Sequence, residues 1–131
     1  IFILKKMFLA LLKNSLAMSK IYKVKWTSNA KEDLLNIVDY IKKDSLSAAR
    51  KVYEHIKEKA QSSNFFPLKG RVVPELQKEG ITIYRELIVQ PWRIMYKIEN
   101  DTVYIMAIFD SRQNVEELLL QKLLRGHMLT K

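Results

Sequence analysis

The sequence predicts an α+β domain, in which an antiparallel sheet carries a helical hairpin on one face and is followed by a C-terminal helix. The sheet is expected to combine one N-terminal strand with a three-stranded meander. Three β-rich segments follow one another in the C-terminal half with only short turn signals between them, so they should pair as neighbours. Before them, a short alternating segment precedes two segments whose apolar residues recur at helical spacing.

The N-terminal strand is predicted at residues 21–26, where aromatic and aliphatic residues alternate with lysines. Two helices follow, the first ending near Lys43 and the second near Ala60, and each has an apolar stripe that can face the sheet. Residues 27–29 (Thr-Ser-Asn) offer caps for the first helix, and Ser45 offers one for the second. The first strand must join the sheet from a distance, after the hairpin.

The meander is predicted within residues 84–112. Gln-Pro at 90–91 separates its first two strands because proline cannot donate a ladder hydrogen bond. Asn-Asp at 100–101 separates the second and third, since both side chains tolerate turn geometry. Residues 103–109 are apolar at both alternating positions, which predicts a central strand covered on both faces.

The second strand of the meander shows how the sheet is expected to be covered. Arg93, Met95 and Lys97 alternate along it and should share one face. The opposite face takes the alternate residues, which are aromatic or aliphatic: Trp92, Ile94, Tyr96 and Ile98. We therefore expect one apolar face and one basic face in this part of the sheet.

The segments on either side of the meander have less regular signals. The aromatic loop 65–67 (Phe-Phe-Pro) is expected to pin the end of the hairpin to the core. Lys-Gly-Arg at 69–71 suits a turn that presents charge to a phosphate, or an ordinary solvated turn. Residues 113–124 form the predicted C-terminal helix, which is apolar enough to seal an open side of the sheet or to dock a partner.

Length and charge narrow the classes of function. The chain has 131 residues, of which 48% are hydrophobic, so one compact domain is expected. It has no cysteine and only two histidines, which excludes disulfides and a histidine-based metal cluster. The net charge of +9 is typical of small proteins that meet nucleic acid, ribosomes, acidic partners or anionic membranes.

Residues 1–17 differ from the rest, with three lysines, no acid and a short apolar run. One interpretation is a signal peptide. The favoured one is a non-native or upstream extension, poorly ordered, with Met18 as the natural start of a single domain at 18–131. The apolar run is shorter than the about 20 residues that span a bilayer. Without the extension the net charge would be 9 − 3 = +6.

No familiar catalytic motif is present, so the chemistry rests on arginine, which binds phosphate through a permanently charged fork. The cations proposed to bind a phosphate or the target are Lys69, Arg71, Arg85, Arg93 and Arg112. Cleavage of RNA without a metal also needs an acid or base, for which the nearby candidates are Tyr84, Tyr96, Tyr104, Glu86 and Asp110. A structural salt bridge with arginine is the favoured role of Asp110. The sequence indicates no cofactor and no metal.

Several spaced motifs in a fixed order resemble the RelE/ParE superfamily of type II toxins, over about residues 21–125. They are Gly70–Leu76 (GRVVPEL), Tyr84–Val89 (YRELIV), Trp92–Tyr96 (WRIMY), Val103–Ala107 (VYIMA) and Ser111–Arg112. The first matches the loop that precedes the sheet in the ParE-like branch. The resemblance implies a cytoplasmic toxin, of the kind found in plasmid stabilisation systems, that a cognate antitoxin neutralises. For the antitoxin we expect contacts with Leu119, Leu120 and Leu123.

The superfamily divides by target. RelE-like members cut mRNA in the ribosomal A site, whereas ParE-like members poison DNA gyrase. By position, Arg93 and Arg112 match arginines that RelE-like members use on the scissile phosphate, with Arg85 as a further candidate. However, residues 113–120 lack the tyrosine or histidine that such members commonly carry. The gyrase-directed reading is therefore preferred over the ribonuclease, and a degenerate toxin that acts only as a binding module is the third reading.

Overall fold

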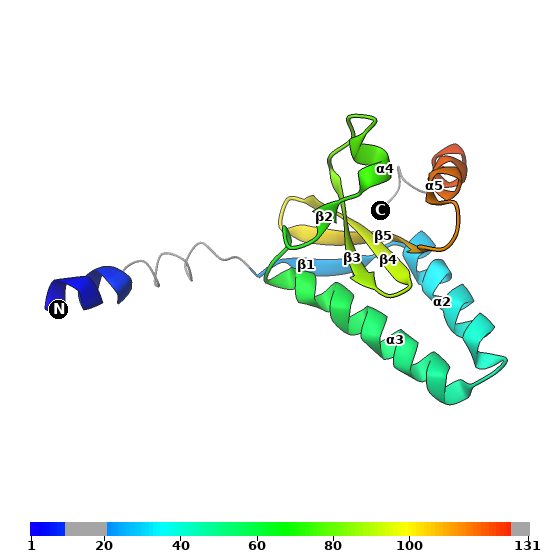
Figure 1. The fold of residues 1–131 in the computed structure, drawn as a ribbon, viewed down its shortest axis with the longest axis horizontal. Helices are drawn as coiled ribbons and strands as arrows, with labels where there is room; N and C mark the ends of the chain where they lie inside the picture. The colour runs from blue at the N-terminus through cyan, green and yellow to red at the C-terminus, as the bar shows by residue number, and fades with distance from the viewer. Residues whose placement is uncertain (10–20, 127–131) are drawn as a thin grey trace.

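The sheet has five strands in the order β1-β5-β4-β3-β2, and helices cover both of its faces (Figure 1). The computed structural model describes residues 1–9 and 21–126. In chain order the elements are β1 (Lys23–Trp26), α2 (Ser28–Lys42), α3 (Leu46–Gln61), the 3-10 turn η1 (Ser62–Asn64), β2 (Arg71–Val72), α4 (Pro74–Gln77), β3 (Tyr84–Val89), β4 (Trp92–Glu99), β5 (Thr102–Asp110) and α5 (Val115–Leu124).

The predicted fold class is confirmed, and the structure adds two features. The meander β3-β4-β5 is antiparallel, but β1 lies parallel to β5, so the sheet is mixed. Strand direction cannot be read from an isolated four-residue segment. A fifth strand, β2, pairs with β3, and α4 follows it; both are too short to give a periodic signal.

The N-terminal segment contains a helix at residues 2–9, all of whose residues are exposed. Residues 10–17 of the predicted extension lie outside the described residues, as do residues 18–20 and 127–131 of the predicted domain. The division of the chain at Met18 therefore stays a prediction. Within residues 1–9 and 21–126, no helix is both long and apolar enough to cross a bilayer.

The caps of the hairpin show how local sequence sets its helices. Thr27 caps α2 by accepting a hydrogen bond from the backbone N–H of Ala30, and Ser45 caps α3 in the same way from Ala48. Asn29 is not the cap of α2. Its side chain instead contacts the sheet.

Two apolar clusters lie on opposite faces of the sheet. The hairpin face packs α2 and α3 against the strands through residues such as Ala30, Ile56 and Ile94. The other face packs α4 and α5 against Met95, Met106 and neighbouring residues. The expectation of a basic second face is therefore wrong, because Arg93 and Met95 lie beneath these helices, 7% and 1% exposed. Of the two roles predicted for the C-terminal helix, sealing the sheet is confirmed, and docking a partner stays a prediction.

A β-bulge in β5 explains how this strand supplies both clusters. Met95 pairs with Ala107, whereas the next residue, Tyr96, pairs with Ile105. Met106 is therefore an extra residue in β5, and the alternation of side chains changes parity there. As a result, Ile105 faces the hairpin whereas Met106 and Ala107 both belong to the cluster under α4 and α5. The predicted burial of residues 103–109 on both faces is confirmed.

The aromatic loop does not pin the hairpin to the core. Phe65 and Phe66 are 55% and 68% exposed. The anchor of this loop is instead polar, because the hydroxyl of Tyr96 donates to the carbonyl of Pro67 at 2.7 Å. A backbone contact of this kind leaves no hydrophobic pattern in the loop sequence.

Candidate functional site

The second face of the sheet, under α4 and α5, holds four linked charges that we call the ion-pair cluster: Arg71, Glu75, Glu86 and Arg93. Glu86 and Arg93 are buried, whereas Glu75 is partly exposed and Arg71 is largely exposed. Glu86, 2% exposed on β3, accepts from Arg93 Nε at 2.7 Å and from Arg71 Nε at 2.6 Å. Arg93 also donates from Nη1 to Glu75 Oε2 at 2.7 Å. The guanidinium of Arg93 is thus held between two carboxylates.

Within the ion-pair cluster, the contact between Glu75 and Arg93 favours the charged form of both residues. The hydrogen bond from Arg93 lowers the pKa of Glu75, against the opposing effect of burial. The same bond raises the pKa of Arg93, again against burial. A buried arginine satisfied in this way cannot contact a phosphate unless its carboxylate partners are displaced.

Arg85 lies apart from this cluster. It pairs across the sheet with Tyr96, whose ring belongs to the hairpin face, and its Nη1 donates to the carbonyl of Gly70 at 2.7 Å. Gly70 is also a backbone donor to the Tyr96 hydroxyl at 3.0 Å. A Cβ at position 70 would lie 2.5 Å from that hydroxyl and from the carbonyl oxygen of Glu86. Glycine is therefore needed for close packing, and its N–H is not available to a phosphate.

Tyr96 itself is fully buried, and burial raises the pKa of its hydroxyl. Because that hydroxyl bonds Pro67 and Gly70, it serves the fold of the loop. Among the other acid–base candidates, Tyr84 is buried, which raises its pKa, and Tyr104 is half-buried. Glu86 bridges two arginines within the ion-pair cluster.

Arg112 lies beyond the end of β5 with its side chain 71% exposed. It donates to both carboxylate oxygens of Asp110, at 2.9 and 2.7 Å, as the preferred reading of Asp110 predicts. This contact lowers the pKa of Asp110, which makes the carboxylate a weaker base. Arg112 borders a groove of about 520 Å³ that also contains Tyr40 and Trp92. Of the predicted cations, the structure brings only Arg71 and Arg93 together around one carboxylate, while exposed Lys69 has no such contact within the described residues.

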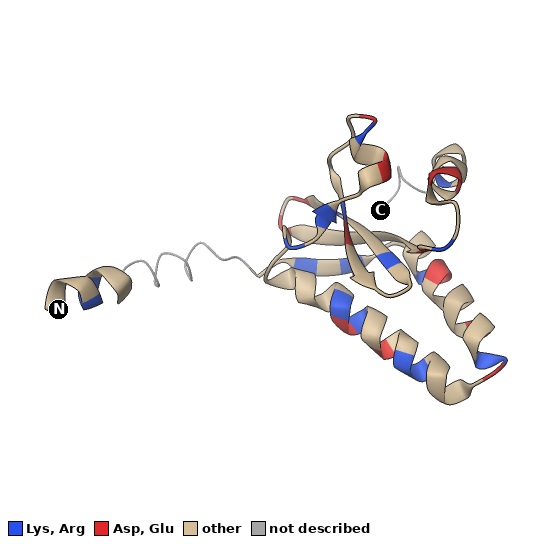
Figure 2. Cartoon of the chain, viewed as in Figure 1, with Lys and Arg blue, Asp and Glu red and all other residues tan. Residues whose placement is uncertain are grey.

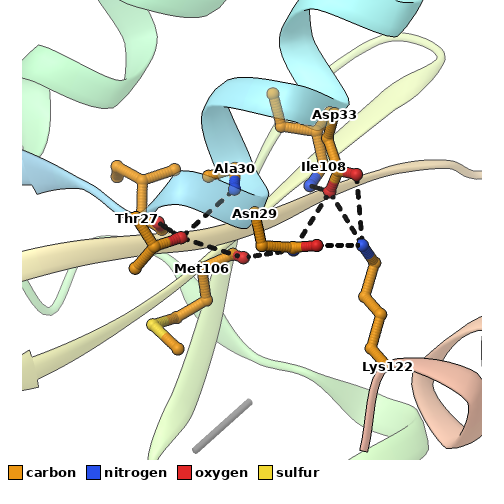
Figure 3. A network of polar contacts seen from close by, with 8 residues as sticks. Thr27, Asn29, Ala30, Asp33, Met106, Ile108 and Lys122 are labelled. Atoms are coloured by element: carbon orange, nitrogen blue, oxygen red, sulfur yellow. Dashed lines mark hydrogen bonds and ion pairs between the residues drawn. The ribbon is translucent and has the colours of Figure 1, made fainter. Parts of the chain in front are cut away.

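A polar network fixes α5 to the start of α2 and to β5 (Figure 3). Strand β1 pairs with β5 only as far as Ile105, so the next part of that edge has no strand partner among the described residues. Side chains of α2 replace it. Asn29 Nδ2 donates to the carbonyl of Met106 at 2.8 Å, and Asp33 Oδ2 accepts from the N–H of Ile108 at 2.9 Å.

Lys122 on α5 completes this network. Its ammonium donates to Asn29 Oδ1 at 3.0 Å and to both Asp33 oxygens at 3.1 Å, and it lies over the ring of Phe109. Burial raises the pKa of Asp33, and the Ile108 amide and Lys122 partly offset that rise. The network was not predicted, although Asn29 and Asp33 stand one helical turn apart, which is the signal that could have found it.

A second groove, of about 500 Å³, lies between α4 and α5 and is called the α4–α5 groove. Its apolar lining comprises Leu76, Ile81, Leu119, Leu120 and Leu123. Its polar lining comprises Glu75, Lys78, Glu79, Asn114, Glu116 and Glu117. Figure 2 marks acidic positions on both helices, whereas β1 carries basic ones.

Comparison with known proteins assigns the family. A family profile described as the ParE toxin of the type II toxin-antitoxin system parDE matches residues 24–115. The chain belongs to the ParE toxin family. The matched range includes the ion-pair cluster of this toxin, the loop at Gly70 and most of the sheet. Helix α5 begins at the end of the matched range and extends beyond it.

Two solved structures share the fold of this toxin. A chain of the chromosomal ParDE toxin-antitoxin system from P. aeruginosa is 22% identical, with a TM-score of 0.57; the match covers 69% of the toxin and 96% of that chain. A chain of the RelBE2 toxin-antitoxin complex from Mycobacterium tuberculosis is 20% identical, with a TM-score of 0.52 and coverages of 70% and 92%. A search of curated proteins gave no match.

The leucines predicted to contact the antitoxin divide into two kinds. Leu119 is 3% exposed and packs in the cluster under α5, so it supports the helix of the toxin from within. Leu120 and Leu123 are 56% and 42% exposed and line the α4–α5 groove. Only these two are available to a partner as the structure stands.

Proposed function

We propose that this ParE-family toxin arrests growth in the cytoplasm by inhibiting DNA gyrase, and that its cognate antitoxin neutralises it there. The observation that carries the choice is the state of Arg93. This arginine matches one used on the scissile phosphate by RelE-like members, yet it is 7% exposed and bonded to Glu75 and Glu86. Phosphate chemistry at Arg93 would first require its carboxylate partners to be removed.

Other residues favour the same choice. Arg85 bonds a backbone carbonyl, and Asp110, the carboxylate nearest Arg112, has a lowered pKa. Residues 113–120 offer no tyrosine or histidine for stacking or proton transfer. The parts of a ribosome-dependent nuclease that the resemblance implies are therefore engaged elsewhere or missing.

The alternative is a ribosome-dependent endoribonuclease, and one observation favours it. The side chains of Arg71 and Arg112 are 60% and 71% exposed, so these two cations can meet an RNA backbone even while they pair with carboxylates. A degenerate toxin that only binds its partner is the third possibility.

Two parallel assays decide between these functions. The first measures supercoiling of relaxed plasmid by gyrase with increasing toxin. The second adds toxin to cell-free translation and maps mRNA ends by primer extension. The proposal expects loss of supercoiling with intact mRNA. Supercoiling that stays undiminished at all toxin concentrations would contradict the gyrase proposal.

The test variant is Arg112→Ala, and Arg125→Ala, at another exposed arginine, is its matched control. Arg112→Ala removes a cation at the end of β5, and Arg125→Ala removes an exposed one after α5. If mRNA is cut only when ribosomes are present, and the cut is lost in Arg112→Ala but kept in Arg125→Ala, the toxin is a ribonuclease. If the protein neither inhibits gyrase nor causes cleavage of mRNA, the remaining function is that of a degenerate toxin that only binds its partner.

A further inference from the structure

The α4–α5 groove has an acidic rim on a chain whose net charge is +9. Glu79 and Glu117 are exposed, and neither carboxylate forms an ion pair within residues 1–9 and 21–126. Of the other rim carboxylates, Glu116 pairs with Lys78 and Glu75 pairs with Arg93. Two carboxylates beside the groove thus have no salt bridge within the described residues.

The wall between these charges is apolar. Leu120 follows Glu116 and Glu117 by four and three positions on α5, so all three lie on one side of the helix. Leu120 and Leu123 are exposed here, and Ile81 is 37% exposed on the α4 side. Exposed leucines framed by unpaired charges are typical of a surface that a partner covers.

The floor of the groove is already fixed. Leu76 and Leu119, buried at 6% and 3%, form part of the cluster under α4 and α5. Lys122 holds α5 to α2 from the other side of the helix. A partner can therefore enter between two anchored elements without first unfolding either of them.

We propose that the α4–α5 groove binds a segment of the cognate antitoxin in which large apolar side chains are flanked by lysine or arginine. The argument is charge complementarity: apolar side chains fill the floor, and cations meet Glu79 and Glu117 at the rim. An antitoxin for a chain of charge +9 is expected to be acidic overall, so this segment should be a local basic exception. The inference rests on the antitoxin in the proposed function, but not on gyrase as the target.

The test uses the purified full chain and two fluorescent synthetic peptides as probes. Both peptides carry leucines at the same helical spacing; one has lysines at the flanking positions and the other has glutamates. Fluorescence anisotropy should show about tenfold tighter binding of the lysine peptide, which corresponds to about 1.4 kcal/mol. If only the net charge of +9 on the chain mattered, the glutamate peptide would bind more tightly.

Two charge-reversal variants locate the site. Glu79→Lys with Glu117→Lys should invert the preference, so that the glutamate peptide binds more tightly. Glu54→Lys with Glu58→Lys makes the same change in net charge on exposed positions of α3 and should keep the preference for lysine. All four positions are exposed, so both variants should fold, which circular dichroism checks.

Three results of the peptide binding experiments would overturn the proposal. They are tighter or equal binding of the glutamate peptide, the same inversion in the α3 variant, and no binding of the lysine peptide at about 1 mM. Dimerisation of the chain that Leu120→Asp abolishes would assign the groove to a second copy instead. Because no gyrase is present, the result stands whether or not the toxin inhibits that enzyme.

Discussion

The two faces of the sheet are covered in different ways. On the hairpin face, two helices of 15 and 16 residues pack an apolar cluster that includes Ala30, Leu34 and Ile56. On the other face, the four-residue α4 and the ten-residue α5 cover a smaller apolar cluster, the ion-pair cluster and one side of a groove. The long helices are held mainly by apolar burial, with polar contacts to the sheet at the start of α2. The two short helices rely in addition on ion pairs, that of Glu75 with Arg93 for α4 and that of Lys122 with Asp33 for α5.

The largest effect on the face under α4 and α5 is expected from removing the central carboxylate of the ion-pair cluster, Glu86. Glu86→Ala leaves Arg93 buried with one carboxylate instead of two, and it releases Arg71. We expect the free energy of unfolding to fall by about 3–5 kcal/mol. Urea denaturation measures it. Asp110→Asn, which breaks the exposed pair with Arg112, serves as the control and should change stability by less than about 1 kcal/mol.

Truncation along α5 tests which of its leucines belong to the fold. Leu119→Ala should lower the free energy of unfolding by about 2–5 kcal/mol, because it opens a cavity under the helix. Leu120→Ala should stay within about 0.5 kcal/mol, since that side chain is exposed. Thermal unfolding compares the two. Equal losses would contradict the division between core and groove.

The Lys122 network tests how a short helix is positioned. Lys122→Met leaves the partly buried Asp33 carboxylate without its cation and should lower the free energy of unfolding by about 1–3 kcal/mol. Lys51→Met, on an exposed position of α3, should be nearly neutral. Adding Asp33→Asn to Lys122→Met should restore part of the loss. The single variant Asp33→Asn is measured as well. If the loss of unfolding free energy in the double variant equals the sum of the losses in the two single variants, Lys122 and Asp33 are not coupled.

The smallest expected effect is a pH dependence. Arg93 lowers the pKa of Glu75 in the folded state, so Glu75 binds protons more weakly there than in the unfolded chain. Its contribution is fully present above the ordinary pKa of 4.5 and is lost as pH falls below it. Glu75→Gln should therefore make stability less dependent on pH in this acidic range. An unchanged acid titration would show that the pair does not contribute.

Sequence reasoning predicted the regular half of this molecule. Alternation and helical spacing located the meander, the hairpin and α5, because each buries a repeated apolar pattern. The order of motifs also identified the superfamily. The direction of β1 and the two-residue β2 left no such pattern, since both depend on contacts between distant segments.

The candidate site was harder to predict, because a cation and its partner can lie far apart in sequence. Arg93 reads as a surface residue on an alternating strand, yet Glu75 and Glu86 enclose it. Phe66 reads as a core residue, yet it is exposed. Only Asp110 and Arg112, two residues apart, revealed their pairing in the sequence.

The extra residue at Met106 has a consequence for comparing this chain with distant relatives. A relative without the bulge has one residue fewer in this strand, so an alignment without a gap there would shift every later position by one. Arg112 would then be aligned with the residue of the relative that corresponds to position 111 or 113 of this chain. At about 20% identity, where few residues mark the register, an apparent loss or gain of this arginine can be a counting error rather than a change of chemistry.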